Sequence, residues 1–478
     1  MDNAKKIGLF TLTALVISSM VGSGIFSLPQ NMAEVSGAWG IIYGWIIAGG
    51  GIIFLGLSFF FISRLRPDLD GGVYTYAREG FGELVGFLSA WGYWASATIG
   101  TVGYVVVAFE GVGTFTDSSS NVIFGAGNTI ASFIGASIIV WLVHSLIASG
   151  VKQAAIVNFI ATLVKISPLI LFIIVALFYF KADIFTFDMD ASNLKTPLIS
   201  QIKSTMLITL WAFIGVEGAS ILSAHAKKKS DVGLATILGI LIVLSIYVLV
   251  TLLSLGILPQ ETIAKLSNPS MAGILEHMIG KSGKIIITLA LIISVLASYV
   301  SWTLYASEIP YQGALKGAFP KILRKTNKNS VPIGGLFFTG LTVQICLILV
   351  LATGEGYVTL LLIATSMILV PYFLVGAYLI KLSFSKSTPL KNGFWVKATG
   401  ILATLYGIWL IYAAGLDTLL LSVLLYTPGL LVFLYSRFEE RKNGLEIKKL
   451  NPLERLIVIL IVLLFIYALY ENAQKLFS

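Results

Sequence analysis

The sequence predicts an all-α polytopic membrane protein, from its composition, its recurrent apolar runs and the distribution of its basic residues. Of 478 residues, 57% are hydrophobic and only 12% are charged. Soluble domains carry about 25% charged residues, so this chain has too few charges to cover a water-exposed surface. The net charge of +9 is divided among short loops, which favours a bilayer over a nucleic acid as the partner. A soluble enzyme, a nucleic-acid binder and a disordered tail are therefore poor interpretations.

Runs of about 20 mostly apolar residues, the length of a membrane-crossing helix, recur along the whole chain. They cover residues 7–32, 39–63, 83–112, 127–148, 153–180, 199–224, 233–258, 285–311, 333–352, 356–380, 396–414, 418–437 and 456–470. The last run is the least certain, so we predict about 12 or 13 transmembrane helices. The loops leave no room for a soluble domain, and residues 1–478 are predicted to form a single transmembrane domain.

The basic residues indicate which ends of these helices face the cytoplasm. With the N-terminus inside, about 24 of the 32 basic residues lie on the inner side, as the positive-inside rule requires. The inner loops then carry Arg64, Arg66, Arg78, Lys152, Lys227, Lys228, Lys229, Lys316, Lys321, Arg324, Lys325, Lys328, Lys381, Lys386, Lys391 and Lys397. We predict a cytoplasmic N-terminus, and a thirteenth span would place the C-terminus outside.

Glycine clusters interrupt two of the spans near their midpoints. Gly22 and Gly24 lie in the first span, and Gly215 and Gly218 lie in the sixth. Glycine inside a helix costs about 0.5–1 kcal/mol relative to alanine, so each cluster weakens the helix locally. Close packing through small residues is the alternative explanation. The clusters occupy corresponding positions if the chain contains two inverted repeats of five helices, which favours two discontinuous helices.

The expected repeats cover about residues 7–181 and 199–381, with additional C-terminal helices in about 396–476. Unwound backbone at membrane depth persists only where it is buried or lines a polar cavity. There, free amides suit a carboxylate and free carbonyls suit an ammonium. A free amino acid carries both groups on one carbon, so the breaks predict an amino acid substrate.

Ionisable and aromatic side chains inside the apolar runs are candidates for gating or proton coupling. Glu217 follows the sixth-span glycine, and the alternative to a gating role is a structural hydrogen bond. Lys165 lies in the middle of the fifth span, too far from a helix end to reach water. Its ammonium could join carbonyls of the broken first helix to Ser298, or it could be only a structural strut. Trp211, Trp302 and Tyr93 would line a cavity, although packing explains each of them singly.

No other chemistry is expected from the sequence. The single cysteine, Cys346, excludes an internal disulfide and a cysteine-based metal site. We find no intramembrane carboxylate pair, histidine cluster or Ser/His/Asp spacing, which argues against a membrane-embedded enzyme. We therefore predict no metal and no cofactor.

Four motifs resemble the amino acid–polyamine–organocation superfamily. The first is Gly-Ser-Gly-Ile-Phe at residues 22–26, followed by Leu28 and Pro29, and the second is Trp-Ala-Phe-Ile-Gly-Val-Glu at residues 211–217. The other two are Pro-Asp-Leu-Asp-Gly-Gly-Val-Tyr-Thr-Tyr-Ala at residues 67–77 and Ser-Ala-Trp-Gly-Tyr-Trp at residues 89–94. These two resemble the basic amino acid/polyamine antiporter family, and most of all its arginine/ornithine antiporters.

The resemblance implies a LeuT-type five-plus-five inverted repeat with discontinuous helices 1 and 6. It also implies a binding site at those breaks, with Ser23 and Gly24 at the substrate carboxylate and the backbones of Met20, Trp211 and Ile214 at the ammonium. Gly22 would belong to the same substrate-binding segment. Trp302 would stack on the substrate side chain, and Ser96, Ala97 and Thr101 would line its pocket. Trp211, Glu217, Lys165, Ser298 and Tyr93 would serve gating or proton coupling.

Two departures from the family pattern leave the substrate open. Arginine-recognising relatives carry asparagine at the position of Thr101, and some carry it at Ser19. Threonine can still accept a guanidinium hydrogen bond but shapes a different pocket. Lysine, histidine, tyrosine and neutral amino acids therefore stay open as substrates.

The resemblance implies an antiporter in the bacterial cytoplasmic (inner) membrane. It would exchange arginine or lysine for a product such as ornithine by alternating access, without sodium. One alternative is a proton-coupled importer of other or broader specificity, with Lys165 or Glu217 carrying the proton. Another is a sensor that binds an amino acid without moving it. Whether the chain forms a homodimer is left open.

Overall fold

The computed structural model describes residues 6–118, 120–354, 357–385, 393–442 and 449–477. Within these ranges the regular secondary structure is helical, and the only β-type pairings are two isolated β-bridges in the loops. The helices are α1 (Leu9–Met20), α2 (Gly24–Val35), α3 (Ala38–Leu65), α4 (Val73–Phe81), α5 (Glu83–Thr116), α6 (Ile130–Ser149), α7 (Val151–Tyr179), α8 (Ala182–Thr186), η2 (Ser192–Leu194), α9 (Leu198–Phe213), α10 (Gly218–Ile221), η3 (Ser223–His225), α11 (Lys229–Leu255), α12 (Gln260–Ala264), α13 (Ser270–Ile279), α14 (Lys281–Leu315), η4 (Lys321–Arg324), α15 (Ile333–Thr353), α16 (Tyr357–Ser383), α17 (Gly393–Lys442) and α18 (Pro452–Phe477).

The number of membrane spans agrees with the sequence prediction. Twelve segments among the described residues are long and apolar enough to cross a membrane, and α1 with α2 forms a further, bent pair. Helix α17 supplies two of the twelve, which meet at Gly415, where φ is +80°. Each predicted apolar run corresponds to one of these segments. The all-α polytopic fold is therefore confirmed.

The helix ends and the short helices were not predicted. Helices α5 and α14 extend beyond the predicted runs 83–112 and 285–311, and α4, α8, α12 and α13 lie between spans. Hydropathy marks only the part of a helix that needs an apolar environment, so polar helix ends and short interfacial helices give little signal.

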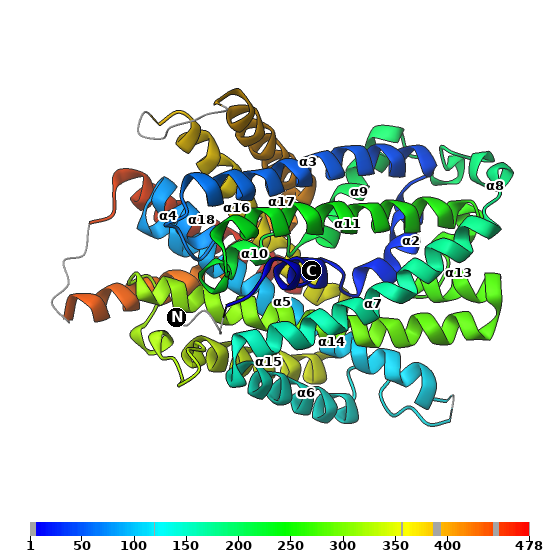
Figure 1. Cartoon of the computed structure of the whole chain (residues 1–478), viewed down its shortest axis with the longest axis horizontal. Coiled ribbons are helices and arrows are strands. Elements are labelled where there is room, and N and C mark those ends of the chain that lie inside the picture. Colours follow the sequence, from blue (N-terminus) through cyan, green and yellow to red (C-terminus); the bar gives the residue numbers. More distant parts are fainter. Residues whose placement is uncertain (1–5, 119, 355–356, 386–392, 443–448, 478) are drawn as a thin grey trace.

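The long helices run roughly along the longest axis of the molecule (Figure 1). Helices α4 and α10 lie at one end, on the left of Figure 1, and α8 and α13 lie at the other. Arg64 at the end of α3, Arg66 in the loop before α4, and Lys227 to Lys229 between η3 and the start of α11 are at this first end. We call this the basic end of the molecule.

Two groups of helices pack mainly among themselves. The first, the bundle group, contains α1 and α2, α3, α9 and α10, and α11. The second, the scaffold group, contains α5, α6, α14 and α15. Helix α7 packs on α14 and helix α16 packs on α5, while α1 packs on α11 and α9 packs on α3. The contact of the fifth span (α7) with the eighth (α14) corresponds to that of the tenth (α16) with the third (α5). The contact of the first span (α1) with the seventh (α11) likewise corresponds to that of the sixth (α9) with the second (α3), as an inverted repeat would require.

Small residues allow the bundle group to pack closely. A Cβ added at Gly44 on α3 would lie 2.4 Å from Thr205 Oγ1 on α9. A Cβ at Gly56 would lie 2.1 Å from Ile240 Cδ1 on α11. Close backbone approach through glycine is a usual device for packing membrane helices. It holds α3 against both the broken sixth span and α11.

Candidate functional site

The first span is broken as predicted. Helix α1 ends at Met20, Val21 turns out of the helix with ψ of 80°, and α2 begins at Gly24 at an angle of 43° to α1. Side chains from three other helices bind the carbonyl oxygens of residues 18–22. These are Lys165 on α7, Tyr247 on α11, and Ser294, Ser298 and Trp302 on α14. The unwound backbone is therefore satisfied inside the protein, as its depth in the membrane requires.

Lys165 is fully buried and makes the contact with Ser298 that the sequence predicted. Its Nζ lies 2.8 Å from Ser18 O, 2.6 Å from Val21 O, and 3.0 and 3.1 Å from the hydroxyl oxygens of Ser18 and Ser298. A cation within reach of several carbonyl and hydroxyl oxygens is charge-stabilised by their dipoles. Lys165 therefore binds the backbone at the C-terminal end of α1.

The sixth span is interrupted over residues 214–217. Helix α9 ends at Phe213, Ile214 has a ψ of 126°, and Gly215 has a φ of +114°. This left-handed conformation favours glycine, which explains why a glycine stands there. Ser19 Oγ donates a 2.9 Å hydrogen bond to Gly215 O, so the two breaks contact each other directly.

Glu217 joins the second break to α16. Its carboxylate accepts a 2.6 Å hydrogen bond from the Tyr372 hydroxyl, which in turn accepts a 3.2 Å hydrogen bond from the Gly215 amide. Glu217 is fully buried, and its Oε1 has no hydrogen-bond partner among the described residues. The Tyr93 hydroxyl faces this carboxylate from α5. The structural hydrogen bond expected as the alternative role is present, and the gating role stays a prediction.

Aromatic rings lie against the two glycines of the first break. A Cβ added at Gly24 would lie 1.9 Å from Cζ3 of Trp211, so the indole ring rests on the first turn of α2. A Cβ at Gly22 would lie 2.8 Å from Cε1 of Tyr104 on α5. The amides of that first turn suit a carboxylate. Gly22 and Gly24 thus leave room at the backbone for large rings or for a ligand.

Trp302 contacts the first break through its indole nitrogen. Nε1 donates a 3.0 Å hydrogen bond to Ser19 O, and only 3% of the residue is exposed. Its ring stacks on Tyr93 at 6.0 Å and meets Tyr305 edge-on at 5.8 Å. The rings of Tyr93 and Tyr305 therefore cover part of the Trp302 ring on which a substrate side chain is expected to stack. Stacking of Trp302 on a substrate stays a prediction.

The predicted side-chain pocket lies on α5. Ser96, Ala97 and Thr101 are all buried there. The Thr101 hydroxyl donates a 2.6 Å hydrogen bond to Thr98 O in its own helix. While this hydrogen bond is made, the oxygen has lone pairs that can accept a hydrogen bond from a ligand. An acceptor at this position suits a donor-rich guanidinium or ammonium group.

Of the predicted ammonium ligands, the Met20 carbonyl is already engaged. It accepts hydrogen bonds from the Tyr247 hydroxyl at 2.7 Å and from the Gly22 amide at 2.9 Å. A carbonyl oxygen has two lone pairs, so both are used here. Trp211 O accepts from the Ile214 amide at 3.3 Å.

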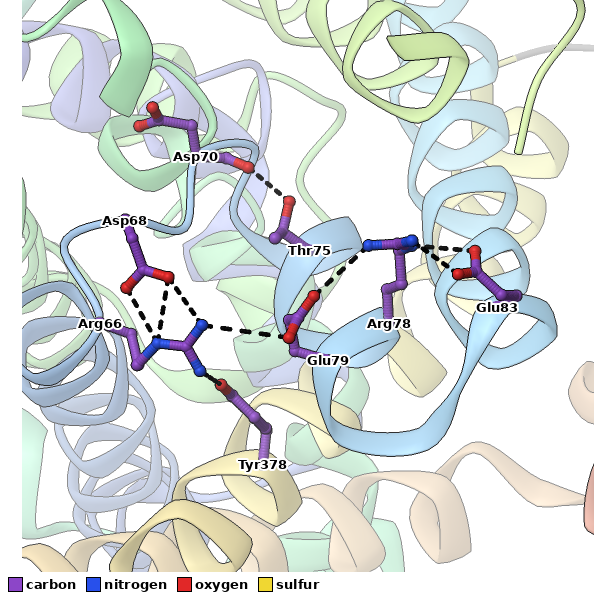
Figure 2. A network of polar contacts seen from close by, with 8 residues as sticks. All are labelled: Arg66, Asp68, Asp70, Thr75, Arg78, Glu79, Glu83 and Tyr378. Carbon is purple, nitrogen blue, oxygen red and sulfur yellow. Dashed lines mark hydrogen bonds and ion pairs between the residues drawn. The ribbon is translucent and has the colours of Figure 1, made fainter. Parts of the chain in front are cut away.

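A network of ion pairs fixes α4 at the basic end (Figure 2). Arg66 lies 2.7 Å from Asp68 and 4.0 Å from Glu79, while Arg78 lies 3.4 Å from Glu79 and 2.6 Å from Glu83. Hydrogen bonding from Arg66 lowers the pKa of Asp68. Such partly exposed pairs contribute up to about 1 kcal/mol each. Together they join the end of α3 to the start of α5 through α4, within the loop whose motif resembled the antiporters.

A second set of contacts at the basic end joins the sixth span to its surroundings. His225 Nε2 lies 3.2 Å from Glu308 Oε2 on α14, and both side chains are buried. Asp70 accepts hydrogen bonds from Ser223 Oγ, at 2.9 Å, and from Lys229 Nζ. None of these contacts could be predicted from the sequence, because the residues lie at the ends of spans, where polar side chains are common.

Sequence reasoning also missed several ligands of the breaks. Tyr247, Ser294, Tyr372 and Tyr104 bind or cover the unwound segments. Buried serines and tyrosines are frequent in this chain, so single residues gave no signal. The spacing of Ser294, Ser298 and Ser301 along α14 would have indicated one polar helix face. Among the described residues, no group of three or more His, Cys, Asp or Glu side chains could hold a metal ion.

The fold and the paired breaks define a multi-pass membrane protein of the transporter class, and comparison with known families agrees. A family model described as amino acid permease matches residues 7–434, and the chain belongs to this family.

Individual relatives cover almost the whole chain. A putative arginine/ornithine antiporter of Escherichia coli (strain K12) is 52% identical over 433 residues, 91% of this chain and 92% of the relative. An arginine/ornithine antiporter of Pseudomonas aeruginosa is 44% identical over 450 residues, 92% of each chain. An arginine/agmatine antiporter of Chlamydia abortus is 41% identical over 474 residues, 97% of each chain. The resemblance drawn from the four motifs is confirmed.

Proposed function

We propose that this chain is an antiporter that exchanges arginine or lysine for a related product such as ornithine. The main support is the pair of broken helices, which contact each other through the hydrogen bond from Ser19 Oγ to Gly215 O. They place the first amides of α2 beside the end of α9, where a carboxylate and an ammonium could bind together. The names of the relatives support a basic amino acid and exchange as the mode of transport.

Lys165 supports transport without sodium. A sodium site at the end of α1 would need the carbonyls of Ser18 and Val21, and Lys165 already binds both. We place the protein in the bacterial cytoplasmic membrane with its N-terminus inside, since the basic loops gather at one end of the molecule. Substrates pass through chemically unchanged, because the buried groups serve to bind rather than to react.

Counterflow in proteoliposomes tests this proposal. We expect uptake of labelled arginine to rise at least about tenfold when the vesicles contain ornithine, and to be unaffected by replacing sodium with potassium. Equal uptake with and without internal amino acid would contradict exchange. Uptake driven by an imposed pH gradient into vesicles that contain no amino acid would support the proton-coupled importer. Calorimetric binding without any flux would support a sensor.

A competition panel identifies the substrate. Unlabelled amino acids and amines, each at the same concentration, compete with labelled arginine during exchange. We expect arginine, lysine and ornithine to compete most strongly, since the relatives are named arginine/ornithine and arginine/agmatine antiporters and the Thr101 oxygen can accept a hydrogen bond from a basic side chain. A neutral amino acid that competes as well as arginine would contradict basic specificity.

A further inference from the structure

The segment that follows the sixth span makes contacts of two kinds at the basic end. Its backbone pairs with Ile7, two residues before α1: the Ile7 amide donates to His225 O, and the Lys227 amide donates to Ile7 O. These bonds stay within the bundle group. The His225 side chain points the other way and contacts Glu308 on α14, in the scaffold group. His225 therefore joins the two groups that alternating access would have to separate at this end.

A neighbouring side chain fixes the Glu308 carboxylate in position for its contact with His225. Its second carboxylate oxygen accepts a 2.6 Å hydrogen bond from Gln312 Nε2, one helical turn further along α14. Only 2% of the Glu308 side chain and 5% of the His225 side chain are exposed. When a buried ion pair loses one charge, the other charge is left buried without compensation, which is strongly unfavourable. The contact thus depends strongly on whether the imidazole carries a proton.

We propose that His225 and Glu308 form a proton-dependent latch that closes the basic, inner end of the transport pathway. The part of this inference that concerns transport rests on the proposed antiport. When the imidazole is protonated, the pair is charged and the bundle group is held against the scaffold group. When the proton leaves, the ionic attraction is lost and only the hydrogen bond from Nε2 to Glu308 remains, so the inner end opens more readily.

The surroundings of His225 set the pH range of the latch. Burial opposes the charged imidazole, but the carboxylates of Glu308 and Asp70 favour it more, and the pKa of His225 is raised above its usual value. Lys229 opposes this rise, and Lys152 lines the same small cavity of about 40 Å³ as His225. The latch is therefore complete below about pH 6.5, the usual histidine pKa. It weakens as the pH rises through the raised value.

The geometry also indicates where the proton binds. With a proton on Nε2, the imidazole donates to Glu308. Nδ1 is buried and has no hydrogen-bond partner among the described residues. Nδ1 is therefore the nitrogen that gains and loses the proton. Asp70 and Lys229 form a neighbouring ion pair at the same end of the molecule.

A spin-label experiment tests the latch without any substrate. Labels are placed on exposed Lys228→Cys, after the sixth span, and exposed Lys316→Cys, at the end of α14, with Cys346 replaced by serine. Distances are measured in the full-length protein by double electron–electron resonance at pH 6.0 and 8.5. We expect one short distance at pH 6.0 and a longer-distance population that grows about three- to tenfold at pH 8.5.

Histidine variants separate the latch from a general effect of pH. His225→Gln keeps a hydrogen-bond donor for Glu308 but cannot be charged, so its distances at both pH values should match those of the unsubstituted chain at pH 8.5. Glu308→Gln should behave in the same way. His277→Gln, at an exposed position on α13, should keep the full pH response. A pH response that persists in His225→Gln, or no response in the unsubstituted chain, would overturn the latch.

Exchange measurements extend the test to transport. Labelled arginine is exchanged for internal ornithine while the internal pH is varied from 5.5 to 8.5 and the external pH is held constant. We expect the rate to rise about three- to tenfold with internal pH, and this rise to be absent in His225→Gln and present in His277→Gln. If no exchange occurs at any pH while the spin-label distances still respond, the proposed antiport fails and the latch stands. Exchange with an unchanged pH profile in His225→Gln would reject the latch and leave the antiport intact.

Discussion

The two helix breaks are held by different kinds of contact. At the first break, side chains from α7, α11 and α14 bind the carbonyls of residues 18–22, and one of them, Lys165, is a buried cation. At the second, the hydroxyls of Ser19 and Tyr372 bind Gly215, and Tyr372 also binds the Glu217 carboxylate. Most ligands of the first break donate to carbonyl groups, whereas the second depends on one glycine conformation and one acidic side chain.

This difference suggests a division of labour between the breaks. The first break is bound from both helix groups, since Tyr247 belongs to the bundle group and the α14 residues belong to the scaffold group. It can therefore present a fixed set of backbone groups to a substrate headgroup. The second has fewer ties and includes a group that can take up a proton. We infer that the first break supplies binding and the second supplies movement.

Replacing Lys165 should have the largest effect. Lys165→Met keeps the length of the side chain but removes the charge and the hydrogen bonds to Ser18 O and Val21 O. Charge-assisted hydrogen bonds contribute about 1.5–3 kcal/mol each, so losing two predicts exchange slower by about a hundredfold or more. Arginine counterflow measures the effect. Lys203→Met on α9 is the control and should exchange at the unsubstituted rate; full activity of Lys165→Met would contradict a bracing role.

Gly215→Ala should affect the second break strongly. A side chain at a φ of +114° is strained, and the new Cβ would lie 2.7 Å from Ser19 Oγ. Such strain costs about 1–3 kcal/mol, which predicts roughly tenfold slower exchange and a lower melting temperature. Gly50→Ala is the matched control, because no heavy atom lies within 4 Å of its added Cβ. Equal behaviour of the two alanine variants would show that the second break does not need this conformation.

Tyr372→Phe tests the tie between the second break and α16. Without the hydroxyl, the Gly215 amide and the Glu217 carboxylate each lose a hydrogen-bond partner. An unsatisfied buried group costs about 1–3 kcal/mol, so we expect exchange to slow about fivefold or more. Tyr406→Phe is the control, since the buried Tyr406 hydroxyl has no partner among the described residues. If Tyr406→Phe slows exchange equally, the effect belongs to tyrosine packing and not to the break.

The sequence predicted where the helices break better than it predicted which side chains bind the breaks. Glycine clusters in the first and sixth spans indicated where the helices break, and Lys165 in an apolar run indicated a buried cation with Ser298 as its partner. The remaining ligands could not be predicted, because Tyr247 and Tyr372 look like other tyrosines in apolar runs. Which of them meets a break depends on how helices more than 150 residues apart cross. The same holds for His225 and Glu308, whose pairing arises only when two helix groups meet at one end.

The smallest expected effect concerns one member of the polar face of α14. Ser294→Ala removes hydrogen bonds to Val21 O and Gly22 O, but Val21 O keeps Lys165 and Ser298. One neutral hydrogen bond contributes about 0.5–1.5 kcal/mol, so exchange should slow only about two- to tenfold. Ser307→Ala, on the same helix, is the control, because this hydroxyl donates only within α14, to Leu304 O. A loss as large as that of Lys165→Met would mean that the hydroxyls, rather than the cation, hold the first break in shape.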